Sequence, residues 1–251
     1  MLHTERKKIV DGAKIAVLFL HGIIGSPHNF EKFYDIIPEN VSYHAVLLEG
    51  HGGSVKEFGK AKMKNWKKQV SYALENLRKT HNKLIIVGHS MGTLFAIQET
   101  IKNSDKIEGL ILMDSPMKAY LHPIMLKYSC QFLLKLQSKS DPRSIAAVDV
   151  IAVKSDIFLW RYLTWIPRFL ELFREIRATR PLVSKLNCNT SFYQSKDDEL
   201  VPRSAVKYIK PHKNVDLHIL ENSTHFYYPE EDIKIPLKNL EDLLAECIGD
   251  A

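Results

Sequence analysis

The chain has 251 residues, of which 45% are hydrophobic, and its formal net charge at pH 7 is +6. This length suits one large α/β domain or two small ones, and the hydrophobic share is enough for a sizeable core. No apolar run approaches the roughly 20 residues of a membrane-spanning helix, and the amino terminus lacks the apolar segment of a secretory signal. We therefore expect a cytoplasmic protein without stable membrane insertion.

Cysteines and basic residues exclude further classes. Cys130, Cys188 and Cys247 are few, odd in number and widely spaced, which argues against a disulfide framework and against a zinc site. Many of the lysines lie between residues 56 and 83, where such a run usually forms a solvated helix face. Because these basic residues are not interleaved with exposed-looking aromatics, we predict no nucleic-acid partner.

Strand-like and helix-like segments alternate over the first 113 residues. The run IAVLFL at 15–20 is typical of a strand that is covered on both faces. Apolar residues at helical spacing, with lysines between them, predict an amphipathic crossover helix over 63–77. We expect strands at 8–10, 15–20, 43–48, 84–87 and 107–113, and helices over 63–77 and from residue 90 onward.

The alternation breaks after residue 116. Helical patterns run through 121–136, 157–166 and 169–176, with Pro167 as an interruption, and no strand-like run appears before about residue 180. This block has more large apolar side chains than one amphipathic face needs, so some of them are expected to cover another part of the molecule. We predict a core made of 1–116 and 181–251, with a helical insertion at 117–180 that ends by returning to the core.

Alternation resumes after the insertion. A strand is expected at 190–194, a helix entered through Pro202, a strand at 216–220 and a last helix from Pro236. This order predicts an α/β fold with a mostly parallel sheet and helices on both faces. Right-handed crossovers place the carboxyl ends of all parallel strands at one edge, which is where ligand sites of open α/β sheets lie.

A pentapeptide of the form G-x-S-x-G, Gly88-His89-Ser90-Met91-Gly92, joins an expected strand to an expected helix. The two glycines relieve crowding, so the turn can hold the serine in a strained backbone conformation above the sheet edge. An ordinary strand-to-helix connection is the alternative interpretation. We favour Ser90 as a nucleophile.

A serine hydroxyl becomes a good nucleophile only when a base accepts its proton, and a histidine base needs a third group to fix its tautomer. His225 lies in the loop after the last expected strand, whereas His212 falls in a connection and His218 inside a strand. His225 is therefore the predicted base. Asp197 and Asp198 follow the preceding strand, and only one of them can meet the imidazole, because adjacent side chains point in different directions.

Negative charge that develops on a substrate carbonyl oxygen needs two fixed N–H donors. The first is expected from Met91, directly after the nucleophile, and the second from Ile23, in the glycine-rich loop after the strand at 15–20. Gly22 and His89 are expected to contact substrate. His21 more often orders such a loop than acts as a base, and we prefer that role.

Five aromatic side chains of the insertion are candidates for an acyl or alcohol pocket: Phe158, Trp160, Tyr162, Trp165 and Phe169. Packing within the insertion is an equally good interpretation of each. We predict substrate contacts for Trp160 and Trp165.

Several of these motifs together resemble the α/β-hydrolase superfamily. They are HGIIGSPH at 21–28, GHG at 50–52, GHSMG at 88–92, DELVP at 198–202 and NSTH at 222–225, and they span most of the chain outside the insertion. The first and last most resemble compact bacterial carboxylesterases and monoacylglycerol lipases. The resemblance implies a cap from 117 to roughly 167 over the active site. It also favours Asp198, since the acid of the family is commonly followed by two variable residues and then Val-Pro.

The expected activity is hydrolysis of short-chain or medium-chain esters or monoacylglycerols through an acyl-enzyme, without metal or organic cofactor. The expected partner is a small-molecule ester, and the protein is expected to be a monomer or homodimer. Three alternatives stay open at this point. The same triad can act on a thioester, an amide or a carbon–carbon bond, the fold can serve as a non-catalytic ligand receptor, and lysines at 118, 127, 135 and 139 can favour anionic lipid surfaces.

Overall fold

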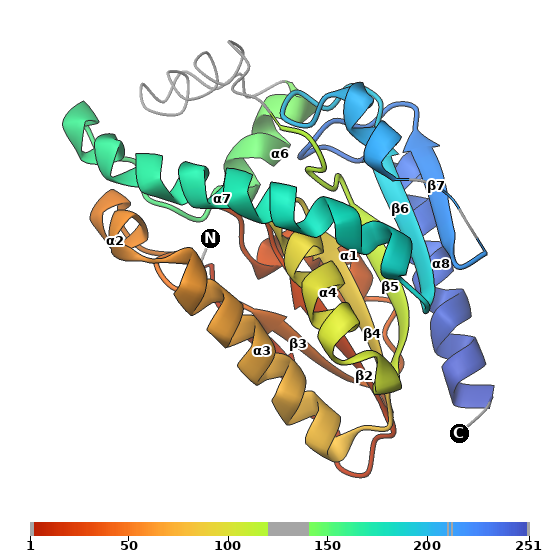
Figure 1. Cartoon of the computed structure of the whole chain (residues 1–251). Coiled ribbons are helices and arrows are strands. Elements are labelled where there is room, and N and C mark those ends of the chain that lie inside the picture. The colour runs from red at the N-terminus through yellow and green to blue at the C-terminus, as the bar shows by residue number, and fades with distance from the viewer. Residues whose placement is uncertain (1–2, 120–140, 210, 212, 250–251) are drawn as a thin grey trace.

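The computed structural model describes residues 3–119, 141–209, 211 and 213–249, and its centre is one seven-stranded sheet (Figure 1). The strand order is β1-β3-β2-β4-β5-β6-β7. Neighbouring strands are parallel, except that β1 pairs antiparallel with β3 at one edge. The strands are β1 (Arg6–Lys8), β2 (Ile15–Leu20), β3 (Ser42–Val46), β4 (Lys83–His89), β5 (Ile107–Met113), β6 (Asn189–Ser195) and β7 (Val215–Leu220).

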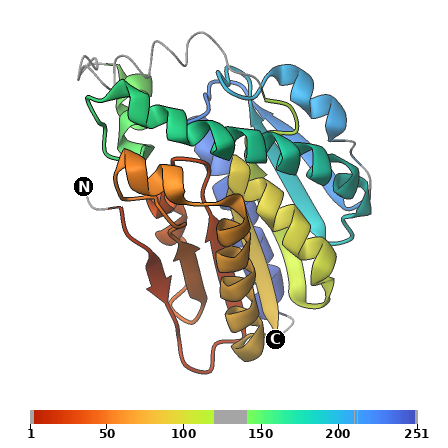
Figure 2. The same ribbon diagram turned by 60° about the vertical axis from the view of Figure 1, so that its left-hand side comes forward.

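Helices cover both faces of the sheet (Figure 2). α3 (Met63–Thr80) and α4 (Met91–Lys102) pack on one face, whereas α1 (Glu31–Tyr34) and α8 (Glu230–Gly249) pack on the other. The remaining α-helices of the described residues are α2 (Val55–Lys60), α6 (Pro142–Val150) and α7 (Ile166–Thr179). The 3-10 helices are η1 (Pro27–Phe30), η2 (Ser104–Lys106), η3 (Leu159–Trp165), η4 (Arg180–Lys185) and η5 (Arg203–Tyr208).

The sheet separates two hydrophobic cores. Successive side chains of a strand point to opposite faces, so in β4 Ile86 packs with α3 and α4 while Ile85 and Val87 pack with α1 and α8. In α3 the apolar side chains recur at helical spacing and are buried, with Trp66 fully enclosed. The mostly parallel sheet with helices on both faces, predicted from the alternation of segments, is confirmed.

Two sequence-based boundaries were wrong, and one expected helix is of the 3-10 type. The edge strand lies at Arg6–Lys8 rather than 8–10, because it pairs with residues 43–45 of β3. The last helix begins at Glu230 rather than Pro236, and this proline is a buried residue inside it. The helix expected after Pro202 is the 3-10 helix η5.

The described part of the insertion is helical. Pro167 does not interrupt a helix: it lies in the first turn of α7, where its missing N–H costs nothing. α7 packs against α3 and α4, and η3 packs against α2. The helical pattern at 121–136 lies outside the described residues, and the division into a core and a cap stays a prediction. None of the helices in the described part of the chain is long and apolar enough to cross a membrane.

Candidate active site

Ser90 occupies the tight turn between β4 and α4. Its backbone has φ 50° and ψ −122°, a conformation that residues with a side chain rarely adopt. A Cβ on Gly92 would lie 1.9 Å from the carbonyl oxygen of Leu20, and one on Gly88 would lie 3.0 Å from the Cα of Thr93. The two glycines of the pentapeptide therefore let this turn pack closely against β2 and the start of α4.

Ser90, His225 and Asp198 form one hydrogen-bonded line. Oγ of Ser90 lies 3.0 Å from Nε2 of His225, and Nδ1 of His225 lies 2.9 Å from Oδ2 of Asp198. The other carboxylate oxygen, Oδ1 of Asp198, accepts hydrogen bonds from the backbone N–H groups of Leu200 and Val201 at 2.7 and 2.8 Å. The turn after β6 thus fixes the carboxylate, which in turn orients the imidazole toward the serine.

The neighbouring aspartate takes the opposite direction. The side chain of Asp197 is 52% exposed, and its carboxylate lies 3.8 Å from the guanidinium of Arg143. The side chain of Asp198 is 1% exposed beside the imidazole. The structure therefore brings Asp198, and not Asp197, to His225.

The charges around His225 favour its protonated form. Burial acts to lower the pKa of the imidazole, but the charge and hydrogen bond of Asp198, with the charges of Asp114 and Glu199, raise the pKa to about 9. Glu199 also accepts the backbone N–H of His225 at 3.2 Å. His89 behaves differently, because burial lowers its pKa to about 3 and its Nε2 donates to the carbonyl oxygen of His225 at 2.9 Å. His89 is therefore a neutral support for the loop that carries the predicted base.

The loop at residues 22–25 lies directly against the serine. A Cβ on Gly22 would lie 2.8 Å from the Cβ of Ser90. Ile24 has φ 57°; its N–H donates to Nε2 of His51 at 3.1 Å, and its carbonyl oxygen accepts from the N–H of Ala152 at 2.7 Å. These bonds hold the loop in a left-handed turn, with Ile23 at the rim of a cavity beside Ser90.

Two further histidines order this loop. Nδ1 of His21 lies 2.8 Å from the carbonyl oxygen of Gly22, and Nε2 accepts the N–H of Leu48 at 3.1 Å. Burial holds the pKa of His21 well below its usual value and lowers that of His51 to about 4. Both rings are neutral acceptors at physiological pH, which agrees with the loop-ordering role expected for His21.

The two expected donors follow residues at the candidate nucleophile: Met91 comes directly after Ser90, and Ile23 directly after Gly22, which packs against Ser90. Met91 is the first residue of α4, and the N–H groups of a first helical turn have no acceptor within the helix. Within the described residues, the N–H of Ile23 has no acceptor in the protein. The positive end of the α4 dipole points at the same place, so this region favours a negatively charged oxygen.

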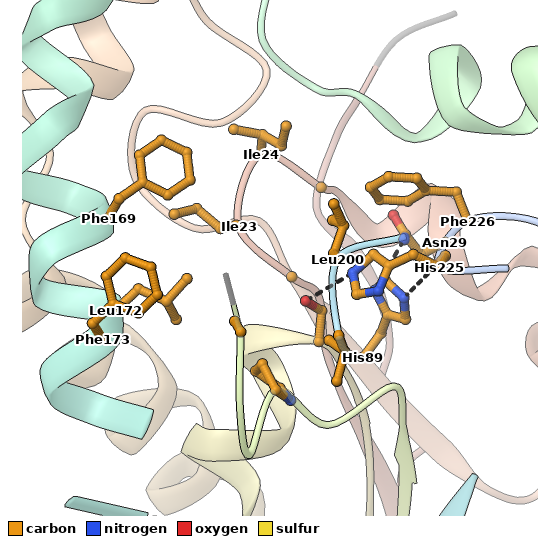
Figure 3. A pocket seen from close by; sticks show the side chains of 16 residues that line it. Ile23, Ile24, Asn29, His89, Phe169, Leu172, Phe173, Leu200, His225 and Phe226 are labelled. Atoms are coloured by element: carbon orange, nitrogen blue, oxygen red, sulfur yellow. Dashed lines mark hydrogen bonds between the residues drawn. The ribbon is translucent and has the colours of Figure 1, made fainter. Parts of the chain in front are cut away.

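A cavity of about 80 Å³ opens beside Ser90 (Figure 3). α7 forms one wall, and the loops that carry Asp198 and His225 form the other. Its lining is predominantly apolar and includes Ser90 itself. The larger apolar side chains are Ile23, Ile24, Phe169, Leu172, Phe173, Leu200 and Phe226.

Comparison with known proteins gives the family. A family model described as serine aminopeptidase, S33 matches residues 11–232. The chain belongs to this family of α/β hydrolases. The matched region contains the loop at 22–25 and the three candidate residues Ser90, Asp198 and His225.

Several similar proteins are lipases or lipolytic enzymes by name. The monoglyceride lipase homolog of Monkeypox virus is 20% identical over 221 residues, which cover 79% of this chain and 78% of the viral protein. A structure from work on the metagenome-derived lipolytic enzymes LipS and LipT has a TM-score of 0.73 at 18% identity and covers 97% and 98% of the two chains. The monoacylglycerol lipase of Paleococcus ferrophilus has a TM-score of 0.65 at 14% identity, covering 96% and 98%. The structural likenesses establish the α/β-hydrolase fold.

The two tryptophans that were expected to contact substrate lie outside the described lining of the cavity. The side chain of Trp165 packs against Phe58, and its indole N–H donates to the carbonyl oxygen of Val55 at 3.0 Å. Trp160 is 64% exposed, beside Phe158. Neither belongs to the described lining of the cavity, whereas Phe169 of α7 does.

Sequence reasoning missed several residues that line the cavity beside Ser90. Leu172 and Phe173 follow Phe169 at helical spacing, which was a usable signal. Leu200 and Phe226 stand within two residues of Asp198 and His225, so they belong to the same loops at the sheet edge. A search outward from each candidate residue would have found them.

One cluster has donor atoms close enough for a metal ion. Ligand atoms of His89, Asp114 and His225 lie within 4.8 Å of one another. These atoms are already engaged: the imidazole of His225 contacts Ser90 and Asp198, His89 donates to a carbonyl oxygen, and Asp114 accepts bonds from Ser195. The donor set is therefore committed to protein hydrogen bonds and does not fit a metal.

Proposed function

We propose that the chain is a serine hydrolase of carboxylic esters that works through an acyl-enzyme at Ser90. The observation that carries this proposal is the line from Ser90 Oγ to His225 Nε2 and from His225 Nδ1 to Asp198, at 3.0 and 2.9 Å. Both distances allow direct proton transfer and orientation of the base. Catalytic roles for Ser90, His225 and Asp198 are part of this proposal.

The first step forms the acyl-enzyme. His225 accepts the proton of Ser90 as Oγ attacks the ester carbonyl, and the N–H groups of Ile23 and Met91 stabilise the oxygen that becomes negative. When the tetrahedral intermediate collapses, the bond to the alcohol oxygen breaks and the imidazolium returns its proton to that oxygen. Asp198 stabilises the imidazolium throughout.

The second step repeats the chemistry with water. His225 removes a proton from water as the water oxygen attacks the acyl carbon. The collapse of the second intermediate breaks the bond to Oγ, returns the proton to Ser90 and releases the carboxylic acid. Neither step uses a cofactor or a metal ion.

The cavity favours an ester with an apolar acyl group. Phe169, Leu172 and Phe173 on α7 face the serine across the opening, and no acidic residue belongs to the described lining. An aminopeptide carries an α-ammonium group, which needs a carboxylate partner when it is desolvated. We therefore prefer short-chain or medium-chain esters or monoacylglycerols to peptides, although the matching family is described as a peptidase.

The cap is part of the proposal. We assign 117–180 as the segment that covers the site and selects substrate, because α7, which belongs to it, supplies one wall of the cavity. Gly22 and His89, which also line the cavity, are proposed substrate contacts. Thioesters and amides share the acyl-enzyme route. A panel of p-nitrophenyl esters, acyl-CoA thioesters and aminoacyl anilides separates these classes, and we expect the esters to be turned over fastest.

Exposed apolar side chains favour a lipid surface as the place of action. They lie on η3, on the first turns of α7 and just before them: Ile157, Leu159, Trp160, Leu163, Ile166 and Leu170. Exposed aromatic and aliphatic groups of this kind partition into the boundary between head groups and acyl chains. Of the lysines expected to assist, Lys118 is described, and the other three lie outside the described residues. Co-sedimentation with anionic vesicles, with and without salt, tests this role.

The deciding experiment compares two buried serines. Ser90→Ala should abolish turnover of p-nitrophenyl butyrate and labelling by a fluorophosphonate. Ser115→Ala is the matched control, because Ser115 is 1% exposed and its hydroxyl has no hydrogen-bond partner in the described structure. Turnover retained by Ser90→Ala refutes the proposal. Loss of turnover in His225→Ala excludes the non-catalytic receptor.

A further inference from the structure

Asp114 is a second buried carboxylate beside the triad. It follows β5 directly, it is fully buried, and its backbone has φ 47°. Aspartate is among the few residues that tolerate this left-handed conformation. A ligand oxygen of Asp114 lies within 4.8 Å of a ring nitrogen of His225, although neither step of the proposed hydrolysis uses it.

Hydrogen bonds connect this carboxylate to Asp198. The side-chain amide of Gln194, near the end of β6, donates to Oδ1 of Asp114 at 3.1 Å and to Oδ2 of Asp198 at 3.2 Å. An amide nitrogen has two hydrogens, so it can serve both carboxylates at once. Asp198 Oδ2 is the same oxygen that meets His225 Nδ1. The position of Asp114 is thus transmitted to the acid of the triad through one side chain.

A second connection reaches the loop of the base. The hydroxyl of Tyr228 donates to Oδ2 of Asp114 and lies 3.3 Å from the carbonyl oxygen of His225. The backbone N–H and the hydroxyl of Ser195 also donate to Asp114, at 2.7 and 2.9 Å. Four donors therefore surround this carboxylate, as expected of a site that can hold a charge.

We propose that Asp114 is a positioning residue of the hydrolysis proposed above. It holds Asp198 through Gln194 and the His225 loop through Tyr228, and its charge adds to that of Asp198 on the imidazolium. The inference rests on the proposed function, because it assigns to Asp114 the task of setting the pH range in which His225 works.

The surrounding charges agree with this role. Asp198 and Glu199, from the loop after β6, and Asp114, after β5, all act to raise the pKa of His225. His89, after β4, stays neutral because burial lowers its pKa to about 3. Burial, and next the charge of Asp198, raise the pKa of Asp114 itself to about 8, whereas the hydrogen bonds from Tyr228 and Ser195 act to lower it. Asp114 therefore gains its charge over the same pH range in which His225 loses its proton, and the loss of a donor shifts that range.

The test is the pH profile of kcat/KM for a p-nitrophenyl ester. In Asp114→Asn a neutral side chain of the same shape replaces the carboxylate, so the pKa of His225 falls and the acid limb moves to lower pH, by about one unit or more. Asp197→Asn is the control, because it removes the same charge from an exposed side chain one residue from Asp198. The control profile should overlay that of the wild type.

A second variant tests the same inference even if Asp114→Asn does not fold. Tyr228→Phe removes one donor from Asp114, which raises the pKa of that carboxyl, so the acid limb should move in the same direction by less. NMR titration of ¹⁵N-labelled histidine measures the ionisation of His225 without turnover. Unshifted profiles in both variants, or an equal shift in Asp197→Asn, overturn the inference. Turnover retained by Ser90→Ala refutes the proposed hydrolysis instead, so the two failures are distinguishable.

Discussion

Substitution of Gly22 by alanine should inactivate the protein without unfolding it. The new Cβ would lie 2.8 Å from Cβ and 3.3 Å from Oγ of Ser90, whereas ordinary contacts begin at 3.4 Å. Ser90 is held by its tight turn, so the loop or the serine side chain must move by about 0.6 Å, from 2.8 to 3.4 Å. Because a displacement of about 1 Å at reacting atoms costs about 100-fold in rate, we expect a loss between about 10-fold and 100-fold, and the added methyl group costs about 1–3 kcal/mol of unfolding free energy.

The assay for Gly22→Ala combines kcat/KM for a p-nitrophenyl ester, the rate of fluorophosphonate labelling and thermal unfolding. Both rates should fall together, because both need Oγ in its native place. Gly249→Ala is a matched control, since a Cβ there meets nothing within 4 Å. Wild-type kcat/KM in Gly22→Ala would refute the argument that this loop is packed against the nucleophile.

Three further predictions concern the triad and α7. Asp198→Asn should lower kcat about 10⁴-fold in ester assays at fixed pH, because the imidazole loses the group that fixes its tautomer; a change under tenfold contradicts this. kcat/KM should rise with pH until about pH 9, because only the neutral imidazole of His225 accepts a proton and its pKa is raised to about 9. At pH 7 roughly 1% of His225 is neutral. A flat profile of kcat/KM from pH 6 to 9 contradicts this. Trp165→Phe should lose the bond to Val55 and about 1 kcal/mol in denaturant unfolding, with KM for short esters unchanged; a large KM change would place the indole at substrate.

The sheet and much of the candidate site could be predicted from local sequence. The run IAVLFL is buried on both faces of the sheet, and the buried residues of α3 recur at helical spacing, so both patterns can be recognised in the sequence alone. Because parallel strands end at one edge, the loops after β2, β4, β6 and β7 were expected to meet, and Gly22, Ser90, Asp198 and His225 lie together there. The order of the strands and the positions of their ends were enough to predict that these four residues meet.

The partners of the aromatic side chains could not be predicted in the same way. A tryptophan that binds substrate and one that packs against a neighbouring helix have the same hydrophobicity and the same spacing. Trp165 packs on Phe58 of α2, and the N–H of Gly52, in the loop before α2, donates to the carbonyl oxygen of Ala152, about a hundred residues further along the chain. Long-range pairing of this kind decides which side of α7 faces the cavity, and the sequence of the helix alone does not contain it.

Residues that directly follow parallel strands meet at one edge of the sheet, and this holds for Asp114 as well as for Asp198. Only Asp198 was selected from the sequence. Asp114 follows β5 as Asp198 follows β6, and β5 lies between β4 and β6 in the sheet. The motif Asp114-Ser115-Pro116 marked only the end of a strand, and no role was predicted for its aspartate. In the structure Asp114 is fully buried and accepts a hydrogen bond from Tyr228, which lies in the loop after β7. A polar residue at the end of a central parallel strand should therefore be considered part of the site until its neighbours across the sheet edge are known.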